Sequence, residues 1–538
     1  MGKQPPSIFN DVIGPVMRGP SSSHTAAAVR IGNMIRQYFS GSCRFVAVEI
    51  TPEGSLASTY SSQGSDFGLA GGLLGMSTSD TRLVDSLIIA RENGMEIKIL
   101  ITDFEAHHPN TYRITAASGI DDELPVQFNF LSTGGGMFEL TELDGLPVSV
   151  CGDYYERIYV MSLEELPAAE TIEAEIMNNF PEVELCALSH KGEQALLNIK
   201  TSKPAGKDLL AFIQGLISYD RCCSFTPVLP VSSGKKRRIL FEKAEQLLKL
   251  AEQEKKQLWE MALEYESCRG DLTPGEVETL AAEIIAVMKE SVKSGLAGTD
   301  YSDRILGPQA QKLLSYQGRL FGGSAIKQLI AYVTAVMETK SAMGVIVAAP
   351  TAGACAALPG SLLASAEELD VENSDKLFYK GLLAAAAVGL VIAHQSTFAA
   401  EECGCQAECG SASAMAAAGL TQMAGGNAGE CLAAASMALQ NIIGMVCDPV
   451  ANRVEVPCLG KNVLAAVNAL VSANMALSGF DQVIPLDQTI AAFDQAGRML
   501  PAELRCTGKA GLSTTQASIK LQNRLAGKAD FKAGEQAL

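Results

Sequence analysis

The sequence has few basic residues, few histidines and no long apolar run. Its 538 residues contain 42 Lys and Arg against 60 Asp and Glu, which gives a formal net charge of −18, and only five residues are histidine. This acidic balance works against an extended nucleic-acid surface and against adhesion to anionic membranes. The longest apolar run, 381–393, is shorter than the roughly 18 to 20 residues that cross a bilayer. We therefore expect a protein that acts on a small molecule, with no nucleic-acid or membrane partner.

The first residues also lack the basic segment and apolar stretch of a secretory signal, so we expect a cytoplasmic protein. The chain has 14 cysteines, and because the cytosol keeps thiols reduced, a disulfide framework is not expected. Paired CxxC motifs are missing from the sequence, which makes a closed structural zinc site the weaker explanation of these cysteines. The cysteines point instead to a metal centre or to catalysis.

The order of strand-like and helix-like segments predicts an α+β multidomain protein. Strand patterns near 45–50 and 97–101 alternate with glycine-rich turns, and the central part follows the order βαββαβ of ferredoxin-like folds. The C-terminal part is rich in Ala, Gly, Leu and Met at helical spacing, which predicts a mostly helical domain. The expected units are an α+β domain (1–152), a ferredoxin-like module (153–233), a helical linker region (234–300), a helical domain (301–515) and a tail (516–538).

The strongest functional signal is a cluster of cysteines, six of which lie between positions 403 and 458. Thiolates are soft ligands for iron-sulfur clusters or zinc, and a set of three leaves one metal position for a substrate. Glycines and prolines beside Cys405, Cys447 and Cys458 fix the chain or let it approach a bulky cluster. Two alternatives stay open: reduced core cysteines in an alanine-rich bundle, and a metal knot that uses Cys403 and Cys409.

A second signal is a serine-rich turn that opens a helix: Ser21, Ser22, Ser23, His24 and Thr25. Hydroxyls, free backbone N–H groups and the positive end of the helix dipole favour a carboxylate or a phosphate there. Ordinary helix capping explains the same pattern equally well. His24 favours the functional interpretation, because imidazole is the side chain most readily poised as a base near neutral pH.

Two weaker polar clusters follow along the chain. One contains His107, His108, Asn110 and Thr111, and the other is the glycine triplet after Ser132, formed by Gly134, Gly135 and Gly136. Glycine triplets can cradle an anion, although they more often serve turns.

Together these motifs resemble those of the iron-sulfur-dependent L-serine dehydratases, also called L-serine deaminases or L-serine ammonia-lyases. The similarity reaches to about residue 512 and rests on the segments IGPVMRGPSSSHTAAAVRIG (13–32), GLAGGLLG (68–75), HPNT (108–111), GGG (134–136), AMGVIVAAPTAGACAALPG (342–360), GCQAECGSASAMAAAG (404–419) and CDPVANRVEVPC (447–458).

The resemblance implies a fused polypeptide with a β-chain-like N-terminal domain, an ACT-like module that can bind an amino-acid effector, and an α-chain-like C-terminal domain. The interface-rich helical half favours a homodimer. The resemblance also implies a 4Fe-4S cluster held by Cys405, Cys447 and Cys458, with the fourth iron acting as a Lewis acid on the β-hydroxyl of L-serine while a base removes the α-proton. In that scheme His24 or His108 is the base. The expected substrate site comprises Ser21, Ser22, Ser23, Thr25, Asp66, Asn110, Thr111, Gly134, Gly135, Gly136, Thr351 and Arg505.

Departures from the family pattern lie near the expected pocket. Gln63 replaces a histidine, the segment 394–400 and Lys461 differ from the usual residues, and Cys506 replaces a common glutamate. These changes keep two further functions open: elimination from another small acid, such as L-cysteine or 3-hydroxyaspartate, and a non-catalytic amino-acid or redox sensor. A pyridoxal-phosphate lyase would need a Schiff-base lysine beside a glycine loop, for which 322–327 is a modest candidate.

Overall fold

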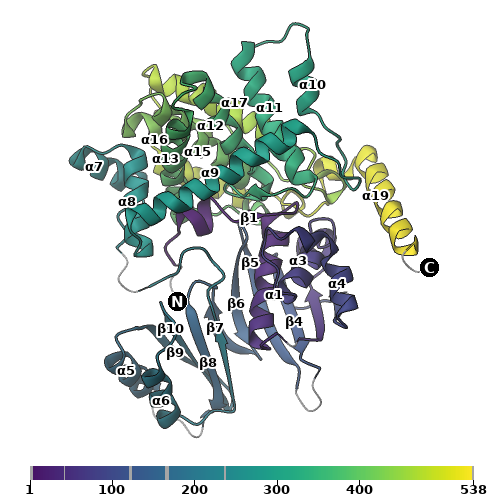
Figure 1. The fold of residues 1–538 in the computed structure, drawn as a ribbon, viewed down its shortest axis with the longest axis vertical. Helices are drawn as coiled ribbons and strands as arrows, with labels where there is room; N and C mark the ends of the chain where they lie inside the picture. Colours follow the sequence, from purple (N-terminus) through teal and green to yellow (C-terminus); the bar gives the residue numbers. More distant parts are fainter. Residues whose placement is uncertain (1–3, 42, 120–123, 164–168, 235–237, 536–538) are drawn as a thin grey trace.

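The structure is a computed structural model that describes residues 4–41, 43–119, 124–163, 169–234 and 238–535, with 169–170 and 527–535 described by their backbone only. The N-terminal and central parts form β-sheets covered by helices, and the C-terminal part is helical (Figure 1). The observed architecture is therefore the mixed one expected from the sequence.

The N-terminal sheet has six strands, in which β2 and β3 are parallel and the other neighbours are antiparallel. Their spatial order is β3 (Glu96–Ile101), β2 (Phe45–Ile50), β4 (Thr111–Ala117), β5 (Val126–Gly134), β6 (Met137–Leu143) and β7 (Leu146–Val150). Alternate residues of β2 and β5 are buried, as in strands with one face on a core.

Helix α1 (Ala27–Tyr38) packs on this sheet, with α3 (Ser65–Leu73) beside it. The two helices approach so closely that a Cβ at Gly32 would lie 2.4 Å from the carbonyl oxygen of Leu69, and one at Gly72 would lie 2.0 Å from that of Val29. The glycines of the GLAGGLLG segment thus serve this helix crossing, which fixes the start of α1 and the serine-rich turn before it.

The central sheet is antiparallel, with the order β11 (Arg221–Phe225), β8 (Tyr155–Ser162), β10 (Gln194–Thr201) and β9 (Val183–Lys191). With α5 (Ala169–Asn179) and α6 (Lys207–Leu216) it shows the element order βαββαβ. The two helices cover one face of the sheet and share a separate core with it, while Ile158, Val160 and Leu196 of the other face join the core of the N-terminal sheet. The ACT-like character of this module stays a prediction.

The C-terminal helices surround α15 (Ser411–Met423), whose residues are all buried. Its main neighbours are α13 (Ser374–Gln395), α16 (Ala428–Gln440) and α17 (Cys458–Leu477). The region expected as a linker contributes α7 (Ala244–Glu254), α8 (Leu258–Gly270) and α9 (Pro274–Ala297) to the same core. Among the described residues, only α13 is long and apolar enough to cross a membrane, and 78% of its apolar window is buried, a property that core helices share.

The first residues of the chain belong to the helical core. Ile8, Val12 and Met17 are buried among the C-terminal helices, and β1 (Val16–Met17) pairs with β12 (Ile346–Val347). The chain then enters the N-terminal domain through residues 18–26. The serine-rich turn therefore lies at the seam between the two domains.

Candidate active site at the domain seam

The serine-rich turn is hydrogen-bonded to residues of the C-terminal domain. The hydroxyl of Ser23 donates to Glu401 Oε1 at 2.7 Å, and the hydroxyl of Ser22 accepts from the backbone N–H of Ala352 at 3.2 Å. All five residues from Ser21 to Thr25 are buried. The turn therefore contributes to a site that needs both domains, beyond any role in capping α1.

His24 lies at the centre of this network and is fully buried. Its Nδ1 is 3.1 Å from the hydroxyls of Ser21 and Ser23 and 3.7 Å from Glu401 Oε1, and its Nε2 is 2.8 Å from Thr59 Oγ1. Burial lowers the pKa of His24, and the charge of Glu401 opposes that shift. Burial therefore favours the neutral imidazole, which can accept a proton.

The hydrogen bonds around His24 indicate which nitrogen is basic. The hydroxyl of Thr59 donates to Ser55 O at 2.6 Å, so its oxygen accepts from His24 Nε2–H. Nδ1 then carries the lone pair on the side of Ser21 and Glu401. His108 differs, because its Nδ1 already accepts from the backbone N–H of Asn110 at 3.1 Å, while its Nε2 lies 3.6 Å from Glu402 Oε1. Of the two candidate bases, His24 has the better placed basic atom.

Two of the three predicted cysteines meet directly. The ligand atoms of Cys405, Cys447 and Glu408 all lie within 4.8 Å of one another, an arrangement that could hold a metal ion. Cys405 follows α14 (Ala400–Cys403) and a glycine with φ of 72°, where a Cβ would come within 2.6 Å of Leu500 Cδ1. Gly404 is therefore needed to bring Cys405 into this group.

Cys458 lies outside this tight group, at the first residue of α17. Burial, followed by the charge of Cys405, raises the pKa of its thiol, which places Cys458 within electrostatic range of that cysteine. Burial, followed by the charges of Cys405, Glu408 and Cys458, likewise raises the pKa of the Cys409 thiol. Cys405 and Cys447 therefore form one group with Glu408, and Cys458 lies near enough to Cys405 for their charges to interact.

A fourth thiol, Cys506, adjoins the pair. It packs with Cys405 and Cys447, shares a hydrogen bond with the Cys447 thiol, and donates its backbone N–H to Cys447 O at 3.0 Å. Gln63, which replaces a family histidine, donates from Nε2 to Cys506 Sγ at 3.7 Å. Residues 63 and 506, both departures from the family pattern, therefore contact each other.

Two lysines bring positive charge to the thiols. Lys461 donates to Val446 O at 2.7 Å and to Asp448 Oδ1 at 3.0 Å, and Lys340 is fully buried and donates to Val454 O. The hydrogen bond from Cys447, assisted by the charge of Lys461, lowers the pKa of Cys405 to about 7 against the effect of burial. At least one of these thiols ionises readily, and thiolates are soft metal ligands. Together with the nearby ammonium groups, they suit an anionic metal centre.

Sequence reasoning missed the two glutamates that flank Cys405. Glu408 accepts from Thr351 Oγ1 at 2.6 Å and from Cys405 Sγ at 3.7 Å, and its pKa is raised by burial and by the charge of Cys405. Its position three residues after Cys405 was a usable signal, because residues at that spacing share a helix face. Glu401 carries no such signal, since its partner Ser23 is 378 residues away.

The other predicted residues lie around this centre or at its edge. Asn110 is fully buried and accepts from Ser55 Oγ at 2.6 Å, while its Nδ2 has no partner among the described residues. Thr111 Oγ1 donates to His108 O at 2.7 Å, and Arg505 Nη1 donates to Glu402 O at 3.0 Å. The glycine triplet has positive φ throughout, and a Cβ added at Gly134, Gly135 or Gly136 would lie nearest to Ala399, Pro350 or Pro15, respectively.

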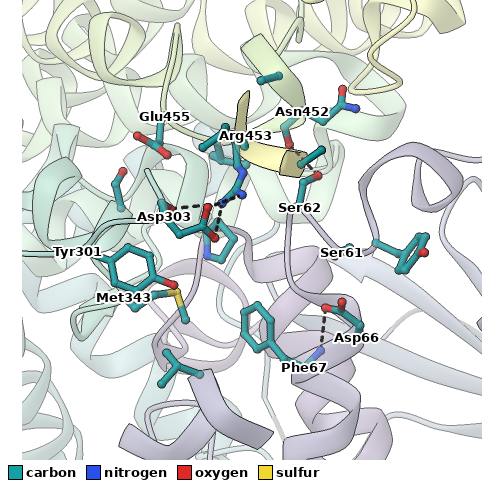
Figure 2. A pocket seen from close by; sticks show the side chains of 18 of the residues that line it. Ser61, Ser62, Asp66, Phe67, Tyr301, Asp303, Met343, Asn452, Arg453 and Glu455 are labelled. Atoms are coloured by element: carbon teal, nitrogen blue, oxygen red, sulfur yellow. Dashed lines mark hydrogen bonds and ion pairs between the residues drawn. The ribbon is translucent and has the colours of Figure 1, made fainter. Parts of the chain in front are cut away.

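Asp66 belongs to α3, which packs against the serine-rich turn, and it lines a cavity of about 750 Å³ (Figure 2). Its carboxylate accepts from the backbone N–H of Phe67 at 2.8 Å. Burial raises the pKa of Asp66 to about 6. The described hydrogen bonds do not join Asp66 to His24 or to the serine-rich turn.

Comparison with known proteins places these features in a family. The family model of the serine dehydratase alpha chain matches residues 253–513. The chain is 38% identical over 247 residues to the "Probable L-serine dehydratase, alpha chain" of Bacillus subtilis (strain 168), which covers 46% of this chain and 82% of that protein. It is 34% identical over 268 residues to the "L-serine dehydratase, alpha chain" of Peptoniphilus asaccharolyticus, covering 49% and 91%.

A relative of the second chain type also matches. The "Probable L-serine dehydratase, beta chain" of Bacillus subtilis (strain 168) is 40% identical over 148 residues, which covers 28% of this chain and 64% of that protein. One polypeptide thus matches relatives of both chain types.

Proposed function

The chain belongs to the serine dehydratase family, and on that premise we propose that it converts L-serine to pyruvate and ammonia. Loss of the α-proton and the β-hydroxyl leaves an enamine, which tautomerises to an imine and is hydrolysed to the two products. The observation that carries the proposal is that the segment 401–408 links both halves of the site. Its Glu401 contacts the serine-rich turn, and its Cys405 and Glu408 belong to the possible metal-binding group that also contains Cys447.

The N-terminal half of the site binds the substrate and removes its proton. Backbone N–H groups and hydroxyls of Ser21 to Thr25 suit a carboxylate. Asn110 Nδ2, which has no hydrogen-bond partner within the described part of the chain, is a further buried donor. His24 accepts the α-proton at Nδ1, where Glu401 at 3.7 Å stabilises the imidazolium that results. Burial of the whole network excludes water from this proton transfer.

The C-terminal half would hold the cofactor. Cys405, Cys447 and Cys458 are the residues for a 4Fe-4S cluster, and the nearby Lys461 and Lys340 fit its negative charge. When bound, such a cluster supplies a Lewis-acidic iron without a protein thiolate, which draws electrons from the leaving hydroxyl. The Glu408 carboxyl accepts hydrogen bonds from Thr351 Oγ1 and from the Cys405 thiol, so Glu408 and Thr351 lie beside this expected cluster ligand.

The test is purification without oxygen, analysis of iron and sulfide, and assay of pyruvate release. About four irons per chain together with pyruvate release from L-serine support the proposal. A protein that carries the cluster but releases pyruvate only from L-cysteine or 3-hydroxyaspartate contradicts the substrate. The contact between Gln63 and Cys506 favours including both acids, because this is where the chain departs from its relatives. A protein that binds amino acids and releases ammonia from none is a sensor.

Three further properties belong to the same proposal. A cytoplasmic location agrees with the composition. Self-association as a homodimer is supported by an exposed apolar face on α17, where Leu464 and Val471 are 52% and 48% exposed. Binding of an amino-acid effector to the central module is supported by its βαββαβ order. Sedimentation of the holoenzyme, with and without amino acids, tests the last two.

A further inference from the structure

The site just described is closed to solvent. His24 is 0% exposed, Cys405 is 1% exposed, and Cys447 and Cys458 are each 4% exposed. A small amino acid therefore needs a route to the seam that opens during each turnover.

A cavity of about 750 Å³ lies beside the seam, between the two domains (Figure 2). Its walls come from the N-terminal domain (20, 58, 60–62, 66–67, 84–85 and 87–88), from the helical domain (301–303, 340–341, 343 and 451–455) and from α19 (Gln516–Glu535). The segment 451–455 also belongs to the loop between Cys447 and Cys458. The cavity therefore borders the thiol site directly.

A thin partition separates the cavity from the thiols. Asn452 O accepts from Ser62 Oγ at 3.1 Å and from Gln63 Nε2 at 3.4 Å, and Gln63 Nε2 also reaches Cys506 Sγ at 3.7 Å. Ser62 and Asn452 line the cavity, whereas Gln63 is 1% exposed and lies behind them. A single layer of side chains thus stands between the cavity and Cys506.

Ser62 and Gln63 are each joined to Asn452 by one described hydrogen bond, of 3.1 Å and 3.4 Å. The same turn is also held by Ser58, which accepts from Asn452 Nδ2 at 3.1 Å and donates to Thr507 O at 2.9 Å. Ala451 and Asn452 both have left-handed backbones, with φ of 50° and 57°. That conformation is unfavourable at a residue with a side chain such as alanine, so movement of this loop relieves backbone strain.

The cavity wall carries groups of both charges: the carboxyls of Asp66, Asp85, Asp303 and Glu455, and the cations of Lys340 and Arg453. Asp66 has no cationic partner among its described contacts, and it faces the cavity from the N-terminal domain. Arg453 lines the wall of the helical domain, where it is paired with Asp303 at 2.9 Å and is partly exposed. A carboxylate on one wall suits an ammonium group, and a guanidinium on another suits a carboxylate.

We propose that this cavity is the substrate vestibule: it binds an α-amino acid zwitterion between Asp66 and Arg453, and movement of Ser62 and Gln63 away from Asn452 admits it to the seam. The identity of the amino acid rests on the proposed function. The route itself does not, because it follows from the cavity and the partition. The vestibule also gives Asp66 a role in substrate capture that is separate from catalysis.

The test fills the cavity and follows access to Cys506. Val84 lines the cavity and is 42% exposed, so Val84→Trp reduces its volume from a surface position. A matched control, Ala106→Trp, fills a different cavity of about 420 Å³ beside His107 and His108. Iodoacetamide alkylation of the full-length holoenzyme, mapped by peptide mass spectrometry, compares Cys506 with the exposed Cys222.

We expect Val84→Trp to slow alkylation of Cys506 and to lower kcat/KM for L-serine, each at least several-fold, without a change at Cys222 or in iron content. Ala106→Trp leaves all four quantities unchanged. Equal rates at Cys506 in the wild type and Val84→Trp, or slowing caused by Ala106→Trp, overturn the proposal.

A second variant guards against misfolding of the first. Ser62→Ala removes one partition bond, and we expect faster alkylation of Cys506; an unchanged rate contradicts the partition. Alkylation needs no turnover. A protein that is inactive on L-serine but shows the expected changes in Cys506 alkylation therefore contradicts the proposed function and still supports the vestibule.

Discussion

The two sides of the seam stabilise their functional groups in opposite ways. On the N-terminal side, His24 is held by three neutral hydroxyls at 2.8 to 3.1 Å. On the C-terminal side, thiols, carboxyls and ammonium groups are buried together, and each shifts the pKa of the others. The first side relies on hydrogen bonds around one imidazole, whereas the second relies on a balance of buried charges, in which the ammonium group of Lys461 interacts with the thiols.

This difference teaches how the two sides depend on each other. Residues 8–17 lie in the helical core, so the serine-rich turn is placed by the C-terminal domain as much as by its own. Glu401 contacts the turn and precedes Cys405 by four residues, so a shift of the thiol loop reaches His24. Substitutions on either side should therefore separate metal binding from proton transfer.

The largest effect is expected on the thiol side. Cys405→Ala removes the thiol most readily ionised near neutral pH, so we expect loss of the metal centre and of measurable activity, read by iron analysis and pyruvate release. The matched control is Cys431→Ala, which removes an equally buried cysteine of α16. Iron retained in Cys405→Ala at the wild-type level would show that this thiol is not a ligand.

The next effect is expected on the proton-transfer side. His24→Asn removes the base while leaving the thiols intact, so kcat should fall by roughly 10²- to 10⁴-fold with iron content unchanged. His190→Asn, at an exposed position on β9, serves as the control. If His108→Asn causes the larger loss, the assignment of the base is wrong.

The sequence predicted the parts of this site that are local. The cysteines, the serine-rich turn and the order of the central module are visible in short motifs and in periodicity. The pairing of β1 with β12 is not, because two-residue strands leave no periodic pattern. Likewise, Gln63 and Cys506 each looked like an isolated departure, and only their contact across 443 residues shows that they belong together.

A smaller effect, on pH dependence, is expected from Glu401→Gln. The carboxylate of Glu401 raises the pKa of His24 against the lowering caused by burial. Since the base must be deprotonated, activity is lost as pH falls through that pKa, and in Glu401→Gln the loss should begin at a lower pH. The acidic limb of kcat/KM measures this shift. An unchanged limb would mean that Glu401 does not act on the base.

The smallest effect is expected in the vestibule, where a change should alter capture of the substrate but not its conversion. Asp66→Asn removes the carboxylate that faces the ammonium group, so KM should rise a few-fold with kcat unchanged. Burial raises the pKa of Asp66 to about 6, so the wild-type KM should itself rise as pH falls below that value, and Asp66→Asn should lose this dependence. Asp103→Asn, in the other cavity, is the control. A fall in kcat alone would place Asp66 in the catalytic step and leave the vestibule without its anionic group.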